Sequence, residues 1–401
     1  MTSSASKPSR NIVLLGFVSL LNDISSEIIQ PILPLFIASL GGGSLAIGLI
    51  GGISDGIPSL LQVFAGFWSD MKGKRKPAVV GGYGLSAIGK LLLSFSVSWQ
   101  QVFVLRVLER SGKGIRTAPR DAMISESADA NNRGRGFGLH RAMDSSGAVI
   151  GSVIAYFLWK GGLDFSSIFL IAGLLALVAL IPFAKVRETY RLRQDTAGSA
   201  AAHADGHLSL SISSLSPELR SFMAIASLFA LGNISYMFFI LKAQQLFTGS
   251  MATAAPLLLY VLFNFVYAAL SIPIGIWSDK VGRKKVLAIG YVLFSVTAFG
   301  FSAISSLAGM IILFALYGLV YAIVDASQSA FVADLSHSRL RGTSLGLYYS
   351  VVGIAAIISG VVAGWLWSWQ GPSSVFLLGS AASLLAALAL WRMKVPGAVE
   401  S

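Results

Sequence analysis

Acidic side chains interrupt an apolar stretch near the start of the 401-residue sequence. Asp23 and Glu27 stand four residues apart, so in a helix they share one face. A carboxyl group in apolar surroundings can bind and release a proton, because burial favours its neutral form and a nearby cation favours its charged form. We therefore predict that Asp23 and Glu27 are proton-coupling residues, that is, that they bind and release protons as the protein works. A permanent structural ion pair is the alternative.

A second stretch, near residues 101–121, presents a row of charges on one helix face. At 100° per residue the row falls within an arc of about 120°, and it consists of Arg106, Glu109, Arg110, Lys113, Arg116 and Arg120. We predict that Arg106 and Glu109 act with the two carboxylates in proton coupling, and that Arg110 and Lys113 bind a small molecule. The last two cations of the row lie near the end of the stretch, where long side chains are expected to snorkel to water.

Other polar residues stand deep in apolar stretches. Asp55 and Lys90 lie in consecutive stretches, each about 20–22 Å from one end at 1.5 Å per residue, so we predict an ion pair between them, with a proton relay as the alternative. His140, Arg141 and Asp144 open a further stretch and form either a gate or a salt-bridge cluster. In the second half the predicted substrate-binding residues are Asn233, Tyr236, Asn264, Asp325 and Gln328, with Lys242 and Tyr267 as further polar candidates.

The elements that hold these residues are apolar and long. The chain is 55% hydrophobic and 12% charged, against about 25% charged in a soluble domain. Stretches of roughly 20 residues, enough to cross a bilayer, lie near residues 11–40, 45–69, 77–98, 101–121, 136–159 and 165–184, and near residues 219–246, 254–278, 285–304, 307–333, 343–368 and 373–391. The sequence thus predicts an all-α membrane protein with twelve transmembrane helices.

The charges of the connections predict the orientation. Lys and Arg gather in the links Lys72–Lys76, Arg133–Arg135 and Lys280–Lys285, whereas Gly41–Ser44 and Thr248–Thr253 carry none. By the positive-inside rule, both the N-terminus and the C-terminus are cytoplasmic. The net charge of +12 is therefore a consequence of topology and does not indicate binding to nucleic acid. The chain has no Cys and only four His, so no metal site and no cofactor are predicted.

The two halves of the sequence repeat one another. Residues 67–76 match residues 276–285 without a gap, at an offset of 209. Between the halves, residues 186–218 are rich in Arg, Ser, Ala, Asp and His. We predict a first six-helix bundle over residues 1–185, a cytoplasmic linker over 186–218 and a second six-helix bundle over 219–401.

The repeated segment resembles the loop signature of the major facilitator superfamily. It reads Gly66-x3-Asp70-x2-Gly73-x-Arg75-Lys76, with an echo at Gly275-x3-Asp279-x2-Gly282-x-Lys284-Lys285. This resemblance covers the whole chain and implies two pseudo-symmetric bundles around a central cavity. It also implies that these loops latch the cytoplasmic side. The gating residues so assigned are Gly66, Asp70, Gly73 and Arg75, then Asp279, Gly282 and Arg283.

Two further segments are similar to drug/proton antiporters of that superfamily. Residues 106–112 resemble the signature of their fourth span, and Asp23 followed by Pro31-x-x-Pro34 resembles that of the first. The fifth-span signature is degenerate, since Ser152 stands where Pro is expected. The resemblance implies a monomeric secondary transporter of the inner membrane, whose partners are the lipid bilayer, protons and a small-molecule substrate that it exports.

Two other functions stay open: proton-coupled uptake of an anionic metabolite or metal chelate, and a membrane receptor without transport. No Walker loop, H-E-x-x-H or G-x-S-x-G motif occurs in the sequence. An enzyme is therefore not predicted.

Overall fold

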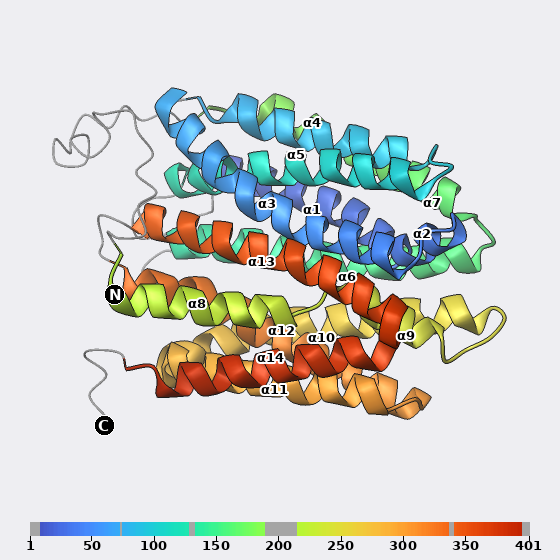
Figure 1. Ribbon diagram of the computed structural model, residues 1–401. Coiled ribbons are helices and arrows are strands. Elements are labelled where there is room, and N and C mark those ends of the chain that lie inside the picture. The colour runs from blue at the N-terminus through green and yellow to red at the C-terminus, as the bar shows by residue number, and fades with distance from the viewer. Residues whose placement is uncertain (1–8, 73, 128–132, 189–214, 337–340, 395–401) are drawn as a thin grey trace. The chain divides into compact units, whose positions relative to one another are not determined.

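The computed structural model describes residues 9–72, 74–127, 133–188, 215–336 and 341–394, and over these ranges the chain is helical, without strands (Figure 1). The helices of the first half are α1 (Arg10–Ile29), α2 (Leu33–Ser39), α3 (Ser44–Lys72), α4 (Lys76–Leu93), α5 (Trp99–Glu126), α6 (Arg133–Lys160) and α7 (Phe165–Val178), followed by the short 3-10 helix η2 (Ile181–Lys185). Those of the second half are α8 (Pro217–Gly232), α9 (Tyr236–Gln244), α10 (Met251–Val281), α11 (Arg283–Ala303), α12 (Leu307–Leu335), α13 (Arg341–Gln370) and α14 (Pro372–Arg392).

The first long segment of each half is a broken helix. The chain turns between α1 and α2 at Gln30–Ile32, where Pro31 lacks the N–H that would continue the helix. The second break, between α8 and α9, falls at Asn233–Ser235. A break exposes backbone groups within a segment, and in transporters such groups line binding sites. The predicted candidate Asn233 lies at one of these breaks.

Ten segments among the described residues are long and apolar enough to cross a membrane. They include α1 with α2, and α8 with α9, each taken as one segment. Helices α4 and α5 occupy the positions of the predicted third and fourth spans but are not among the ten. The predicted number of twelve depends on these two helices and stays a prediction.

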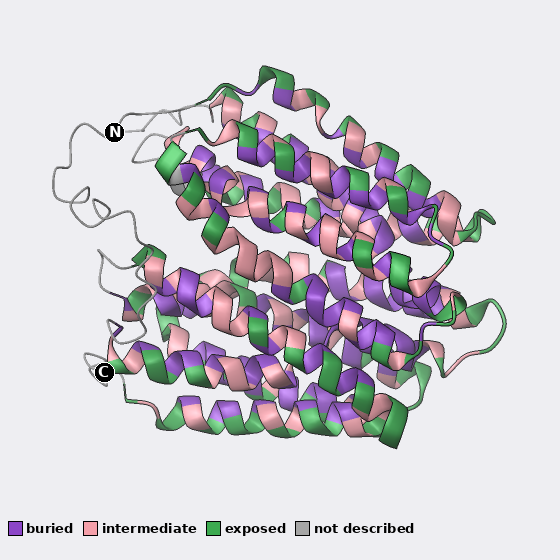
Figure 2. Ribbon diagram, turned by 45° about the horizontal axis from the view of Figure 1, so that its top comes forward, coloured by how far each residue is buried: buried purple, intermediate pink, exposed green. Residues whose placement is uncertain are grey.

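The outer surfaces of the helices are apolar. Figure 2 shows buried and exposed residues alternating along each helix. Many of the exposed side chains are large and hydrophobic, among them Phe157, Ile312 and Leu385. Water-soluble proteins rarely expose extended apolar surface, so these faces are suited to lipid.

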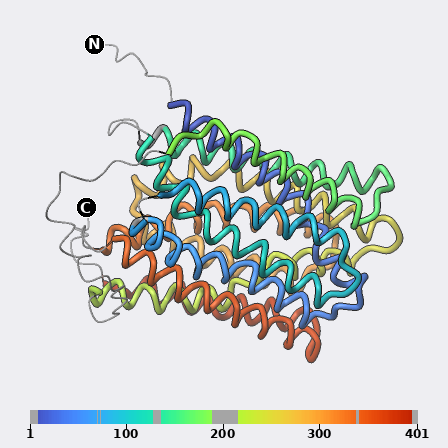
Figure 3. The backbone as a smooth tube through the Cα atoms, turned by 90° about the horizontal axis from the view of Figure 1, so that it is seen from above, coloured from blue at the N-terminus to red at the C-terminus, as the bar shows by residue number. Residues whose placement is uncertain are grey.

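The helices form two compact units, one of residues 1–30 and 61–204, the other of residues 31–60 and 205–401. In the first unit α1 packs along α6 and α7 (Figure 3), and α4 packs on α5 and α7. In the second unit α8 packs on α13 and α14, and α11 packs on α12 and α14. Equivalent helices thus pair in the same way in both units, which is the structural counterpart of the sequence repeat.

The predicted bundle boundaries at 185 and 219 stay a prediction. Residues 31–60 group with the second unit because the first part of α3 packs against α13, where a Cβ added at Gly353 would come within 2.9 Å of the carbonyl oxygen of Gly56. Most of the predicted linker, residues 189–214, lies outside the described residues.

Close backbone contact joins α4 to α5, which lie side by side (Figure 1). A Cβ added at Gly82 would come within 2.7 Å of the carbonyl oxygen of Gly112 and 2.8 Å of the Cβ of Arg116. Only glycine permits this approach. The contact brings the charged face of α5 against α4 and α1.

Candidate functional site

The predicted carboxylates lie on α1, in the first unit. Asp23 is half-buried and has no cation within ion-pair distance in the described part of the chain; the amide Nδ2 of Asn22 lies 3.5 Å from its Oδ1. Glu27, one turn further on, accepts a hydrogen bond of 2.5 Å from the amide of Gln30. The two carboxylates share a helix face, as predicted, but they have different partners.

Glu109 on α5 is held by two guanidinium groups. Arg106 donates to its Oε2 at 2.9 Å, and the Nε of Arg110 lies 3.3 Å from the same oxygen. All three side chains are buried. A carboxylate between two permanent cations is stabilised in its ionised form, which disfavours proton exchange. The proton-coupling role of Glu109 and Arg106 stays a prediction, and the geometry favours a structural role for this triad.

The cations that act on Asp23 come from the second half of α5. Lys113, Arg116 and Arg120 interact electrostatically with its carboxylate, while Arg106, the predicted partner, is engaged with Glu109. Lys113 is exposed, and among the described residues no hydrogen bond or ion pair involves its ammonium. It is therefore a cation that a ligand could reach.

Arg116 corrects one expectation, because it does not snorkel to water. It is only 3% exposed; its guanidinium lies 4.2 Å from the ring centroid of Tyr83 and donates to Ser86 at 2.7 Å. The glycine contact between α4 and α5 draws this turn of α5 into the interior, where an aromatic face and a hydroxyl replace water. Arg120 is also engaged, with Asp121 at 2.9 Å and with Ser19 at 3.2 Å.

Lys90 on α4 is fully buried, and its hydrogen bonds go to α1. They join it to the backbone oxygen of Asn22 at 3.1 Å, the side-chain oxygen of Asn22 at 3.2 Å, and the hydroxyls of Ser25 at 3.2 Å and Ser26 at 2.8 Å. The predicted partner, Asp55, belongs to the other compact unit and interacts there with Tyr317 and Tyr321. The Asp55–Lys90 pair stays a prediction, although the ammonium has four oxygen partners without it.

His140 and Asp144 form a pair at the start of α6, 3.4 Å apart. The His140 Nε2 and the Asp144 Oδ1 are buried without a hydrogen bond. Asp144 also interacts electrostatically with Asp23. The pair lies in a polar cluster next to the carboxylate of α1, and both predicted roles, a gate and a salt-bridge cluster, stay predictions.

The polar residues of the second unit have internal partners. Tyr267 donates to Asp325 at 2.8 Å, which joins α10 to α12. Gln328 donates to Tyr291 at 2.7 Å and accepts from Tyr348 at 2.8 Å, so both ends of its amide are used. Tyr236 and Asn264 are buried. Their substrate-binding roles stay predictions, and Gln328 is occupied in joining α11, α12 and α13.

Each of the two gating loops carries an ion pair to the end of a helix, although the two arginines are not at equivalent positions of the repeat. Arg75 contacts Glu126 at the end of α5, at 2.6 Å, and Arg283 contacts Asp334 at the end of α12, at 2.8 Å. Arg283 also binds Asp279 at 3.0 Å. Gly282 has a φ of 103°, a conformation suited to glycine. In the first loop Gly66 faces the Cβ of Ala118, whereas Gly73 and the side chain of Asp70 lie outside the described residues.

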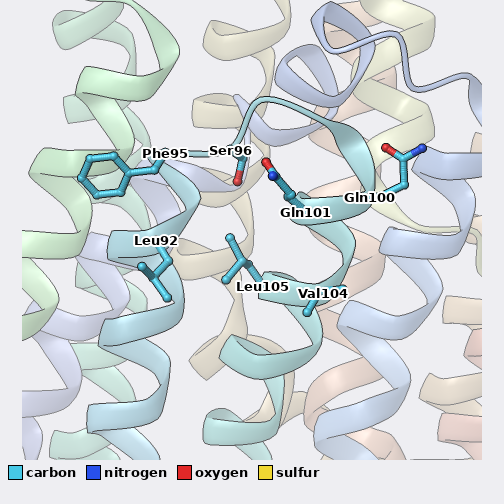
Figure 4. A pocket seen from close by; sticks show the side chains of 7 residues that line it. All are labelled: Leu92, Phe95, Ser96, Gln100, Gln101, Val104 and Leu105. Atoms are coloured by element: carbon cyan, nitrogen blue, oxygen red, sulfur yellow. The ribbon is translucent and has the colours of Figure 1, made fainter.

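A groove of about 470 Å³ lies apart from the charged cluster, at the turn between α4 and α5 (Figure 4). Its lining is mainly apolar, with Leu92, Phe95 and Val104 beside Gln101. No group of three or more potential metal ligands occurs among the described residues.

Apolar outer faces around a buried cluster of charges define a membrane protein with an ionic interior. The sequence matches the pattern of the Major Facilitator Superfamily over residues 15–263 and 221–400. The chain belongs to this superfamily and is a multi-pass membrane transporter, not an enzyme.

Relatives and solved structures agree with this assignment. The chain is 45% identical over 386 residues to the uncharacterized MFS-type transporter MJ1317 of Methanocaldococcus jannaschii, a match that covers 95% of this chain and 94% of the relative. It is 22% identical over 333 residues to the multidrug resistance protein MdtH of Sodalis glossinidius, covering 83% and 79%. The crystal structure of a mutant of the nucleoside transporter NupG has the same fold, with a TM-score of 0.79, 13% identity, and 96% and 100% coverage.

The sequence reasoning missed the oxygen partners of Lys90. Asn22, Ser25 and Ser26 are spaced i, i+3 and i+4 in an apolar stretch, a signal of one polar helix face. That spacing could have identified them as ligands of a buried cation on a neighbouring helix.

Proposed function

We propose that this chain is a proton-coupled secondary transporter that exports a small organic molecule across the inner membrane by alternating access, with Asp23 as its proton-binding group. The observation that carries the proposal is the contrast between the two carboxylates near α5. Glu109 is bound by two guanidiniums, whereas Asp23 is half-buried near three cations without an ion-pair contact. Asp23 is thus the carboxylate that is able to change its protonation state.

Proton binding at Asp23 alters the charge of the cluster. The ionised form attracts Lys113, Arg116 and Arg120, and protonation removes that attraction. A change of one charge in an apolar interior favours one conformation over another. The chain is similar to MdtH, which is named as a multidrug resistance protein, at 22% identity. This similarity supports export of an organic molecule.

The test is proton-driven transport in proteoliposomes. Asp23→Asn should abolish transport driven by a pH gradient and retain substrate binding, because the amide cannot exchange a proton. The matched control is Asp164→Asn, in the exposed connection before α7, which should transport like the wild type. Unchanged gradient-driven flux in Asp23→Asn would exclude Asp23 from the coupling mechanism.

A second candidate function is uptake of an anionic metabolite or chelate. It is favoured by Lys113, which is exposed and whose ammonium makes no hydrogen bond in the described part of the chain. The direction of flux separates uptake from export, and an absence of any flux would indicate a receptor. If the substrate is an anion, Lys113→Gln should weaken its binding while a neutral substrate would bind unchanged.

A further inference from the structure

Lys90 is a buried cation whose hydrogen bonds all go to uncharged oxygens. Its ammonium is fully buried, and its four partners on α1 are one carbonyl, one amide and two hydroxyls. No carboxylate forms an ion pair with it among the described residues. Buried lysines are usually paired with an acid, so a set of neutral partners at this depth calls for another explanation.

The side chain of Asn22 links Lys90 to Asp23. An ammonium only donates hydrogen bonds, so it fixes the amide of Asn22 with its oxygen toward Lys90, at 3.2 Å. The NH₂ group then faces Asp23, with 3.5 Å between Nδ2 and Oδ1. Without the ammonium, nothing in this arrangement requires the amide to keep that orientation.

The charged groups around Lys90 are few. Asp23 on α1 and Glu109 on α5 attract its ammonium, and Arg110 and Arg116 on α5 repel it. Helix α7, which also packs on α4, has no ionisable residue. Glu109 is held in its ionised form by its own guanidinium partners, whereas Asp23 makes no ion-pair contact among the described residues, so of the two carboxylates Asp23 is the one free to exchange a proton.

We propose that Lys90 is a positioning residue for proton coupling: it orients the Asn22 amide toward Asp23 and thereby sets the pH range in which Asp23 exchanges its proton. This inference rests on the proposed role of Asp23. Both the amide donor and the positive charge favour the ionised carboxylate. Loss of either makes release of the proton harder.

The test is the pH profile of proton-driven transport, measured with Lys90→Met, which keeps an unbranched side chain one atom shorter and removes its charge. The pH of half-maximal transport should move upward by about one unit. Lys90→Arg, which keeps the charge, should restore most of the wild-type profile even where the rate is lower. The control is Ser94→Ala, at the residue that follows α4, whose hydroxyl donates only to the carbonyl of Leu91 in the last turn of that helix.

A second variant protects the test against loss of folding. In Asn22→Ala, Lys90 keeps its hydrogen bonds to the hydroxyls of Ser25 and Ser26 but loses the amide that lies between it and Asp23. The pH of half-maximal transport should therefore move upward, as in Lys90→Met. If Lys90→Met folds and has the wild-type pH profile, the inference is overturned. If Lys90→Met does not fold, a wild-type pH profile in Asn22→Ala overturns it. If wild-type flux does not respond to a proton gradient at all, the proposed function itself fails.

Discussion

Glu109 stabilises two buried arginines, and this gives a prediction at the residue scale. Its carboxylate is the acceptor for Arg106 and lies 3.3 Å from the Nε of Arg110. Glu109→Gln leaves both guanidiniums without their counter-charge, and breaking a buried ion pair by removing one partner costs about 3–5 kcal/mol. We expect a large loss of folded protein in detergent, measured as yield and melting temperature.

The control for that substitution is Ser111→Ala on the same helix. The hydroxyl of Ser111 bonds to the carbonyl of Val107 within α5, so its removal should leave the melting temperature nearly unchanged. A Glu109→Gln variant as stable as Ser111→Ala would show that the arginines have sufficient other partners.

The sequence predicts which residues are charged and buried, but not which of them are paired. Spacing on α5 places its cations on one face, and the burial of Arg106, Arg110 and Arg116 agrees with this. Partner choice depends on the register of neighbouring helices, which one sequence does not give. For this reason the sequence favours Asp55 as the partner of Lys90, whereas the ammonium binds Asn22, Ser25 and Ser26.

At the scale of the elements, the contact of α4 with α5 depends on glycine. A Cβ at Gly82 would lie 2.7 Å from the carbonyl oxygen of Gly112, and both belong to rigid helix backbone. Gly82→Ala should therefore push the helices apart and lower the free energy of unfolding by about 1–3 kcal/mol, the usual cost of overpacking. Thermal unfolding in detergent measures this loss.

The neighbouring Gly81 is a matched control, because a Cβ there would have no atom within 4 Å. Gly81→Ala should leave stability unchanged or raise it by up to about 1 kcal/mol, since alanine is the better helix former. Equal effects of the two substitutions would mean that close backbone contact does not hold α4 against α5.

Most of the helices could be predicted from apolar length alone, but their breaks could not. The predicted stretch 11–40 is divided into α1 and α2, and 219–246 into α8 and α9. Pro31 marks the first break in the sequence, whereas the second, at Asn233–Ser235, has no proline. The repeat of residues 67–76 at 276–285 indicates that the two halves are alike, but the helix pairs shared by the two units are seen only in the structure.

At the scale of the whole molecule, the number of spans depends on whether α4 and α5 cross the membrane. Because these two helices carry charged residues, they are less apolar than the ten segments among the described residues that are long and apolar enough to cross a membrane. Yet Lys90, Arg106, Glu109, Arg110 and Arg116 are all buried in the bundle. The residues that these helices expose include Ile88, Leu92 and Val104. What a bilayer contacts is the exposed surface, so charges turned inward do not prevent insertion.

We therefore predict that α4 and α5 both cross, which gives twelve spans with cytoplasmic termini. The chain has no Cys, so single substitutions can be labelled in intact cells with a membrane-impermeant maleimide. Val97→Cys, at an exposed position between α4 and α5, should be labelled from outside. Lys74→Cys before α4, Ser127→Cys after α5, and Ser401→Cys at the C-terminus should react only after the membrane is permeabilised. Labelling of Val97→Cys only after permeabilisation, like the other three, would show that α4 and α5 do not cross, and the chain would then have ten spans.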